Sequence, residues 1–211
     1  MVIETNRMPY TITRHQNNVQ AIDIYTRMLE NRIIFLDEAI NTDVASSIIA
    51  QLLFLESEDR EEDIYMYINS PGGAISDGLA IIDTMEMIAP DISTICVGMA
   101  ASMSATILAA GTKGKRFALP NSEVMIHQPL GGGSGQASDI EIMAKHIIKT
   151  KKKMNQMLAD YTGQKLKTIE KDTERDNFLT SEEALSYGII DSIITKTSTI
   201  KNQKGKYNYE K

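Results

Sequence analysis

The sequence predicts an α/β fold, in which short buried strands alternate with amphipathic helices. Residues 63–69 and 92–97 are runs of β-branched, aromatic and other apolar residues that end at turns, as buried strands do. Each run is followed by apolar residues at helical spacing. Strands and helices in this alternation form parallel sheets through right-handed crossovers. A chain of 211 residues, of which 42% are hydrophobic, is long enough for one domain with a full core.

The first part of the chain is expected to be an arm that leads into this domain. Residues 1–20 are polar and lack a clear period, so we expect a mobile arm. Residues 22–31 have the spacing of a short helix, and residues 32–36 form an apolar strand pattern. Asn41 or Thr42 can cap the next helix. The apolar stripe of that helix consists of Val44, Ile48, Leu52 and Leu55.

The middle of the chain repeats a strand–turn–helix unit. Strand 63–69 leads into residues 70–73, whose sequence Ser-Pro-Gly-Gly is typical of a sharp turn. The helix that follows is expected to end before Pro90. Strand 92–97 then leads to a second apolar helix, which opens near Ser102.

The last part of the chain adds strands and a long helix. Strands are expected over residues 117–119 and 123–126, followed by the flexible glycine-rich segment 131–135. A helix is expected over 137–161, with one apolar face and lysines on its solvated face. The remaining expectations are a helix over residues 166–172, a helix that begins in the capping box 180–183, and a polar, disordered tail from residue 195.

Composition excludes several classes of function. A net charge of −6 argues against nucleic acid as the main partner. The one cysteine, Cys96, excludes an intrachain disulfide, fits a reducing compartment, and lies in a strand pattern typical of a core residue. Residues 92–112 carry no charge but are rich in serine and threonine, which favours a buried strand and helix over a membrane span. With no signal-like N-terminus, we expect a cytoplasmic protein that binds neither nucleic acid nor membranes.

A serine and a histidine carry the chemistry that the sequence suggests. Ser102 opens an apolar helix, where the free N–H of Met103 could hold negative charge, and Gly73 in the preceding turn could supply a second donor. Of the three histidines, His127 alone lies in an apolar, strand-like segment, whereas His15 and His146 are expected at the surface. Such a histidine could activate Ser102 as a nucleophile. The carboxylate that would orient the histidine remains open at this point, and the candidates are Asp172, Glu174 and Asp176.

Six motifs together resemble one family. They are Ser-Pro-Gly-Gly at 70–73, Gly-Met-Ala-Ala-Ser-Met at 98–103, Ala-Leu-Pro-Asn at 118–121, Val-Met-Ile-His-Gln-Pro-Leu-Gly-Gly at 124–132, Asp-Ile-Glu-Ile at 139–142 and Asp-Thr-Glu-Arg-Asp-Asn-Phe at 172–178. Over residues 22–194 the chain is similar to the proteolytic subunits of the ATP-dependent Clp protease. The resemblance implies a crotonase-like superhelix of repeated βαβ units with a protruding strand–helix handle. It also implies a serine endopeptidase, with Ser102, His127 and Asp176 as the catalytic triad and the N–H groups of Gly73 and Met103 as the oxyanion donors.

The same resemblance implies an assembly. Family members form two stacked heptameric rings, a tetradecamer, into which AAA+ unfoldases feed unfolded polypeptide. The partner would use the ATP, because this chain has no phosphate-binding glycine loop, and it has no metal-ligand spacing. The handle would span residues 128–161, and Glu174 and Arg175 occupy positions that pair across the ring interface in relatives. The residues that match the unfoldase-docking cleft are Tyr65, Tyr67, Met87, Ile95, Val97, Phe117, Leu119 and Ile194.

The implied domain plan is an N-terminal axial arm (1–20), a protease domain (21–195) and a polar tail (196–211). Three features depart from the family. The segment 8–20 is longer than usual, so the axial gate and its contacts with the unfoldase are not expected to follow the family pattern. Ser104 stands where the family usually has glycine, and its hydroxyl could bond back to the helix or narrow the substrate pocket. Ser134 lies in an unusually glycine-rich handle strand, so we expect a less rigid handle and easier ring separation.

Two other functions are consistent with parts of the sequence. The altered N-terminus and Ser104 would suit a weakly active or structural ring subunit that works beside a catalytic paralogue. The fold itself also serves crotonase-type enzymes, in which paired amides hold a thioester enolate. Those enzymes do not need a Ser–His–Asp set, so the presence of all three residues favours the peptidase.

Overall fold

The structure, a computed structural model, describes the backbone of residues 10–15 and 18–195. Its centre is a seven-stranded sheet that is almost entirely parallel. The main path of the sheet runs through β3 (Ile33–Leu36), β4 (Ile64–Ser70), β5 (Ile92–Ala101), β6 (Arg116–Ala118) and β9 (Ser192–Ile193). This topology confirms the α/β fold with parallel crossovers.

The strand β5 is long enough to pair with two different strands on the same side. Residues 94–96 pair with β6, and residues 99–101 pair with β7 (Glu123–Ile126), both in parallel. The strand β7 in turn pairs antiparallel with β8 (Asn177–Thr180). This branch of the sheet was not expected from the sequence, which predicted β5 only to residue 97 and no strand at β8.

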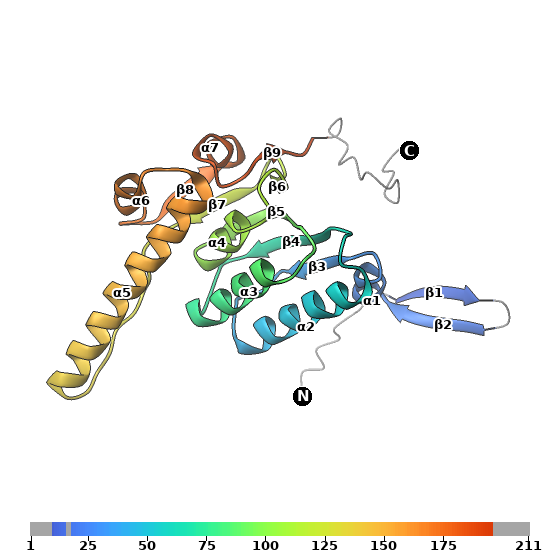
Figure 1. The fold of residues 1–211 in the computed structure, drawn as a ribbon, viewed down its shortest axis with the longest axis horizontal. Coiled ribbons are helices and arrows are strands. Elements are labelled where there is room, and N and C mark those ends of the chain that lie inside the picture. The colour runs from blue at the N-terminus through green and yellow to red at the C-terminus, as the bar shows by residue number, and fades with distance from the viewer. Residues whose placement is uncertain (1–9, 16–17, 196–211) are drawn as a thin grey trace, which may run out of the picture.

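Figure 1 shows three helices along one face of the sheet, which are α2 (Thr42–Glu58), α3 (Ile75–Met87) and α4 (Met103–Ala109). The side chain of Asn41 accepts a hydrogen bond from the N–H of Val44, so Asn41 rather than Thr42 caps α2. Alternate residues of β4 face these helices and are buried, Ile64, Met66 and Ile68 among them. The 92–112 segment divides into β5 and α4, and no helix in the described part of the chain is long and apolar enough to cross a membrane.

The long helix α5 (Ala137–Thr162) extends away from the body (Figure 1). Its buried residues are confined to its second half, at Met154, Asn155, Leu158 and Ala159. It ends at Gly163 in the left-handed conformation, close to the predicted end of the helix at residue 161. The helices α6 (Leu166–Asp172) and α7 (Ser181–Tyr187) follow, and α7 begins in the predicted capping box of Thr180 and Glu183.

Two buried arginines cap helix C-termini with their guanidinium groups. Arg32 donates to the carbonyls of four residues around the end of α2, including Leu55 and Asp59. Arg116 donates to the carbonyls of Ala109 in α4 and Tyr161 in α5 and forms a two-pronged ion pair with Asp191. Carbonyls at a helix end have no partner within the helix, so a cation there is stabilising. Arg116 thereby fastens the base of α5 to the body.

The structure adds a hairpin that the sequence did not predict. In and just after the expected mobile arm, β1 (Tyr10–His15) and β2 (Asn18–Asp23) pair as an antiparallel hairpin that leads into α1 (Ile24–Leu29). Residues 127–134 form no strand with any described part of the chain, so the expected handle strand stays a prediction. Residues 1–9, 16–17 and 196–211 lie outside the described residues, so the predicted mobility of the arm and disorder of the tail stay predictions.

Candidate active site

Ser102 sits in a strained turn between β5 and α4. Its φ of 57° and ψ of −121° are unfavourable for a residue with a side chain. The strain is held by the surrounding structure, because the Ser102 N–H donates to the carbonyl of Met125 on β7 at 2.8 Å. A sharp strand-to-helix turn of this kind directs the hydroxyl out of the sheet, where a substrate can reach it.

The register of the sheet brings His127 and Asp176 to Ser102. Ala101 on β5 lies opposite Met125 on β7, so Ser102 and His127 leave the sheet side by side. Ile126 on β7 lies opposite Asn177 on β8, so Asp176 adjoins His127 from the other direction. Side chains far apart in sequence are thus aligned by backbone pairing before any of their own bonds form.

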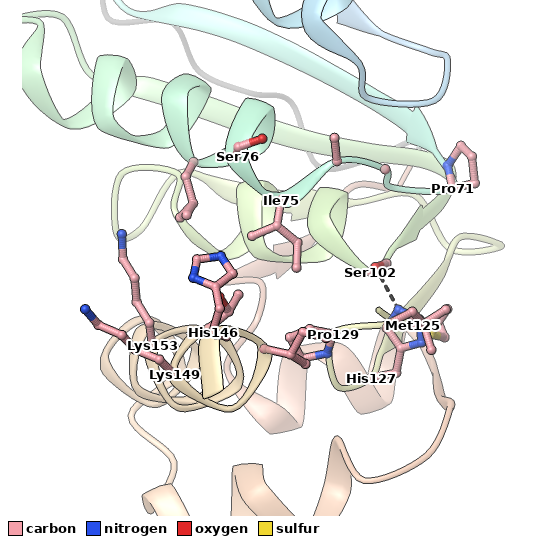
Figure 2. Close-up of a pocket in the computed structure, with 16 residues that line it drawn as sticks. Pro71, Ile75, Ser76, Ser102, Met125, His127, Pro129, His146, Lys149 and Lys153 are labelled. Atoms are coloured by element: carbon pink, nitrogen blue, oxygen red, sulfur yellow. Dashed lines mark hydrogen bonds between the residues drawn. The ribbon is translucent and has the colours of Figure 1, made fainter. Parts of the chain in front are cut away.

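The three side chains form a continuous hydrogen-bonded chain. His127 Nε2 lies 2.8 Å from Ser102 Oγ, and His127 Nδ1 lies 2.9 Å from Asp176 Oδ1 (Figure 2 draws the first bond). A carboxylate beside Nδ1 keeps the proton on that nitrogen, which leaves Nε2 free to accept the proton of Ser102. The imidazole is 12% exposed, whereas the Asp176 side chain is 62% exposed. The base is therefore well enclosed in this chain, but its carboxylate partner is not.

Two main-chain N–H groups, those of Gly73 and Met103, belong to segments that lie close to Ser102. Gly72 and Gly73 have φ values of 90° and 152°, which side chains rarely permit. The turn lies tight against the serine, because a Cβ at Gly72 would lie 2.7 Å from the Cβ of Ser102 and 3.0 Å from the N of Met103. Neither the N–H of Gly73 nor that of Met103 has an acceptor within the described chain. Both donors remain available for an oxyanion.

Ser104 joins the two halves of this arrangement. Its hydroxyl is fully buried, 2.7 Å from the carbonyl oxygen of Ser70 and 2.8 Å from that of Ala101. Of the two expectations for Ser104, the bond back to the start of the helix is confirmed. Ser104 does not line the cleft, so its hydroxyl does not narrow a substrate pocket. It ties the end of β4, just before the Gly72–Gly73 turn, to the peptide that precedes Ser102.

A cleft of about 800 Å³ opens beside Ser102 and His127. Ile75 and Leu79 of α3 form one apolar wall, and Pro129 and Ile147 of the handle region form the other. A small apolar recess adjoins it. The recess is lined by Ile75, Ser102, Met103, Thr106, Ile126, His127, Pro129, Met154 and Leu158. An extended chain with apolar side chains fits such a cleft.

The loop that carries Asp176 is bonded to the handle helix. Lys151 of α5 donates to Glu174 Oε2 at 2.6 Å and to Gln128 Oε1 at 2.9 Å, and Gln128 Nε2 donates to the carbonyl of Glu174. The hydrogen bond and charge of Lys151 lower the pKa of Glu174. Glu174 thus pairs within the chain, while Arg175 is exposed beside Asp176. Sequence reasoning missed Lys151 and Gln128, although the position of Gln128 next to His127 was a usable signal.

The other expected residues lie away from this site. Tyr65, Tyr67, Val97 and Phe117 are half-buried on strands β4, β5 and β6, with Leu119 and Ile194 just beyond strand ends. Met87, at the end of α3, is 67% exposed, but Ile95 is 1% exposed and could only form the floor of a docking surface. His146 is exposed, as expected, yet it also lines the cleft. Cys96 is buried in the core, and burial raises the pKa of its thiol to about 11, so it is no nucleophile.

Comparison with known proteins agrees with this geometry. Residues 15–197 match the family model of Clp protease. A protein of Ligilactobacillus salivarius (strain UCC118), named ATP-dependent Clp protease proteolytic subunit, is 57% identical over 196 residues. The alignment covers 93% of this chain and all of that protein. Together with the hydrogen-bonded serine, histidine and aspartate, these matches mean that the chain is a peptidase and belongs to the Clp protease family.

Proposed function

We propose that this chain is the serine endopeptidase subunit of a compartmentalised, unfoldase-dependent protease, with Ser102 as its nucleophile. The observation that carries the proposal is the chain of hydrogen bonds from Ser102 through His127 to Asp176. The order of groups, with hydroxyl, imidazole and carboxylate in line, is the one that acyl transfer to serine needs.

The mechanism follows from the positions of these atoms. Ser102 Oγ attacks the carbonyl carbon of the scissile peptide bond while His127 Nε2 takes up its proton. The negative charge that develops on the carbonyl oxygen is held by the N–H groups of Gly73 and Met103. His127 then gives the proton to the leaving amine, the C–N bond breaks, and Ser102 is left as an ester. Water, deprotonated by His127, hydrolyses that ester and restores the hydroxyl, while Asp176 keeps the imidazole oriented throughout.

Assembly into rings is supported by apolar side chains that this single chain leaves uncovered. Leu130 is 82% exposed and Ile142 67%, and both lie in the protruding handle region. Soluble proteins rarely leave contiguous apolar surface without a partner. We infer self-association through the handle, with two stacked heptameric rings as the expected form. Native mass spectrometry of the purified protein tests this, with a tetradecamer as the expected mass.

The remaining parts of the proposal rest on the family. A Clp ATPase delivers unfolded polypeptide and consumes the ATP, and this chain uses no metal or cofactor of its own. The half-buried sheet face that includes Tyr65, Tyr67 and Phe117 is the proposed docking surface for that partner. The setting is the cytoplasm. No observation favours a ring subunit without activity, since the buried hydroxyl of Ser104 leaves the cleft open.

The decisive experiment is covalent labelling of the assembled protein with a serine-directed phosphonate, followed by peptide mapping. We expect one labelled site, Ser102, and loss of peptide cleavage in Ser102→Ala with the assembly intact. Ser46→Ala, which changes an exposed serine on α2, is the matched control and should retain labelling and activity. An assembled wild-type particle that neither takes the label nor cleaves peptides would overturn the proposal.

A further inference from the structure

The substrate cleft has a basic end that the reaction itself does not use. Figure 2 shows Ser102 and His127 at one end of the cleft and His146, Lys149 and Lys153 at the other. The three basic residues come from successive turns of α5 and share one face of that helix, because residues three and four apart are neighbours on a helix. They face Ser76 and Leu79 of α3 across the cleft.

The charges at this end are not neutralised within the described chain. Lys145 pairs with Glu141 and Lys151 pairs with Glu174, whereas neither Lys149 nor Lys153 forms an ion pair with any described residue. None of the 16 residues that line the cleft is an aspartate or a glutamate. Since the whole chain carries a net charge of −6, this positive end is a local feature rather than part of a basic surface.

We propose that His146, Lys149 and Lys153 form a specificity subsite for an acidic side chain of the bound polypeptide. The inference rests on the proposed function, because it takes the occupant of the cleft to be the substrate. The apolar walls between the two ends favour a polypeptide over a small anion, since Ile75, Leu79 and Ile147 would contact apolar side chains along the way. The basic residues and Ser102 lie at opposite ends of the cleft, and an extended chain advances only about 3.3 Å per residue. The acidic residue therefore lies away from the scissile bond rather than next to it.

The test uses the assembled full-length protein and a set of quenched fluorescent peptides that share one cleavable residue. The peptides form pairs that differ at a single position on either side of that residue, with glutamate in one peptide and glutamine in the other. Exposed charge pairs strengthen an interaction by about 1.5- to fivefold each. At one position we therefore expect kcat/KM to be about fivefold higher for the glutamate peptide at low ionic strength. The ratio should approach one in about 1 M salt, where charges are screened within about 3 Å.

Variants of the same helix assign the preference to the subsite. The double variant Lys149→Gln/Lys153→Gln should lose the preference, so that its kcat/KM is the same for the glutamate and the glutamine peptide. Lys152→Gln is the matched control, because Lys152 is exposed on α5 but does not line the cleft. It should keep the wild-type ratio. Lys149→Glu/Lys153→Glu should instead favour a peptide with lysine at that position.

Two outcomes would overturn the subsite: no position at which glutamate is preferred, or a preference that survives in Lys149→Gln/Lys153→Gln. The same peptides are also titrated against assembled Ser102→Ala by fluorescence anisotropy, so that the preference is measured without cleavage. If Ser102→Ala binds glutamate peptides preferentially but the wild type cleaves none of the peptides, the subsite is supported and the proposed function is refuted.

Discussion

The buried hydroxyl of Ser104 offers a sharp test of how the nucleophile and the oxyanion donors are held together. Its one proton is shared between the carbonyl oxygens of Ser70 and Ala101, at 2.7 and 2.8 Å. Ser104→Ala removes this donor and leaves buried carbonyl oxygen less well satisfied, which costs about 1–2 kcal/mol. For a domain of this size, each 1 kcal/mol lowers the melting temperature by about 2–4 °C. We expect a fall of about 2–8 °C.

The same change should slow catalysis without weakening substrate binding. The Ser70 carbonyl precedes the turn that carries Gly73, and the Ala101 carbonyl precedes Ser102, so the hydroxyl fixes the distance between donor and nucleophile. An oxyanion is held only in the transition state, and small misplacements of donors are costly there. We expect kcat to fall by about tenfold with KM nearly unchanged, measured on a short fluorogenic peptide that needs no unfoldase.

A second buried serine provides the control. Ser93 Oγ is buried and has no hydrogen-bond partner in the described part of the chain. Ser93→Ala should therefore leave the melting temperature and kcat unchanged, or raise the melting temperature slightly, because no bond is lost. If Ser104→Ala melts and turns over like the wild type, or if Ser93→Ala is equally impaired, the bridging role of Ser104 is refuted.

Two further perturbations test the site and its support. Gly72→Ala should lower peptidase activity at least about a hundredfold, because the new Cβ would lie 2.7 Å from the Cβ of Ser102 in a conformation with φ of 90°. Turnover close to that of the wild type in a peptidase assay would contradict this. Burial alone would raise the pKa of Asp191, but the hydrogen bonds and charge of Arg116 lower this pKa overall. The stability that Asp191 contributes is therefore present at neutral pH and is lost as the pH falls through the lowered pKa. Melting curves should show a wild-type advantage over Asp191→Asn at pH 6 that shrinks below about pH 4; an advantage that grows on acidification would refute the assignment.

The strand and helix pattern was predictable where burial imposes a period. Strands such as β4 are buried on alternate residues, and α5 keeps an apolar face over its second half, so the sequence carries the signal directly. Ser102 and His127 could also be singled out, because each follows an apolar strand and few histidines compete. These inferences need only local sequence and the tendency of parallel strand ends to meet.

The carboxylate could not be chosen from the residues alone. Asp172, Glu174 and Asp176 are close in sequence, and the choice depends on the pairing of β7 with β8. The strand β8 has only four residues, of which Leu179 alone is buried, so its period is too short to recognise. The family motif supplied the answer that spacing lacked, and the register of Ile126 with Asn177 gives its physical reason.

The N-terminal hairpin and the handle segment differ in kind. Strands β1 and β2 pair locally across a short connection, and their alternation of β-branched and polar residues was outweighed by the polar composition of the region. The handle segment is the opposite case, since a strand exists only where a partner accepts its hydrogen bonds. Residues 127–134 have no such partner among the residues that the structure describes. The glycines there do more than add flexibility, because a Cβ at Gly131 would lie 2.8 Å from Ile147 Cδ1 on α5.

His127 and Asp176 are supported unequally, and this follows from the same topology. His127 is placed by β7, whose backbone pairs on both sides, and its ring is largely enclosed. Asp176 directly precedes β8, whose backbone pairs with β7, and its loop is further held by the side-chain bonds from Lys151 and Gln128 to Glu174. Backbone pairing in a central sheet opens only with the whole domain, whereas exposed side-chain bonds open at little cost. The bonds from α5 to Glu174 therefore add to the support of Asp176 and contribute less to that of His127.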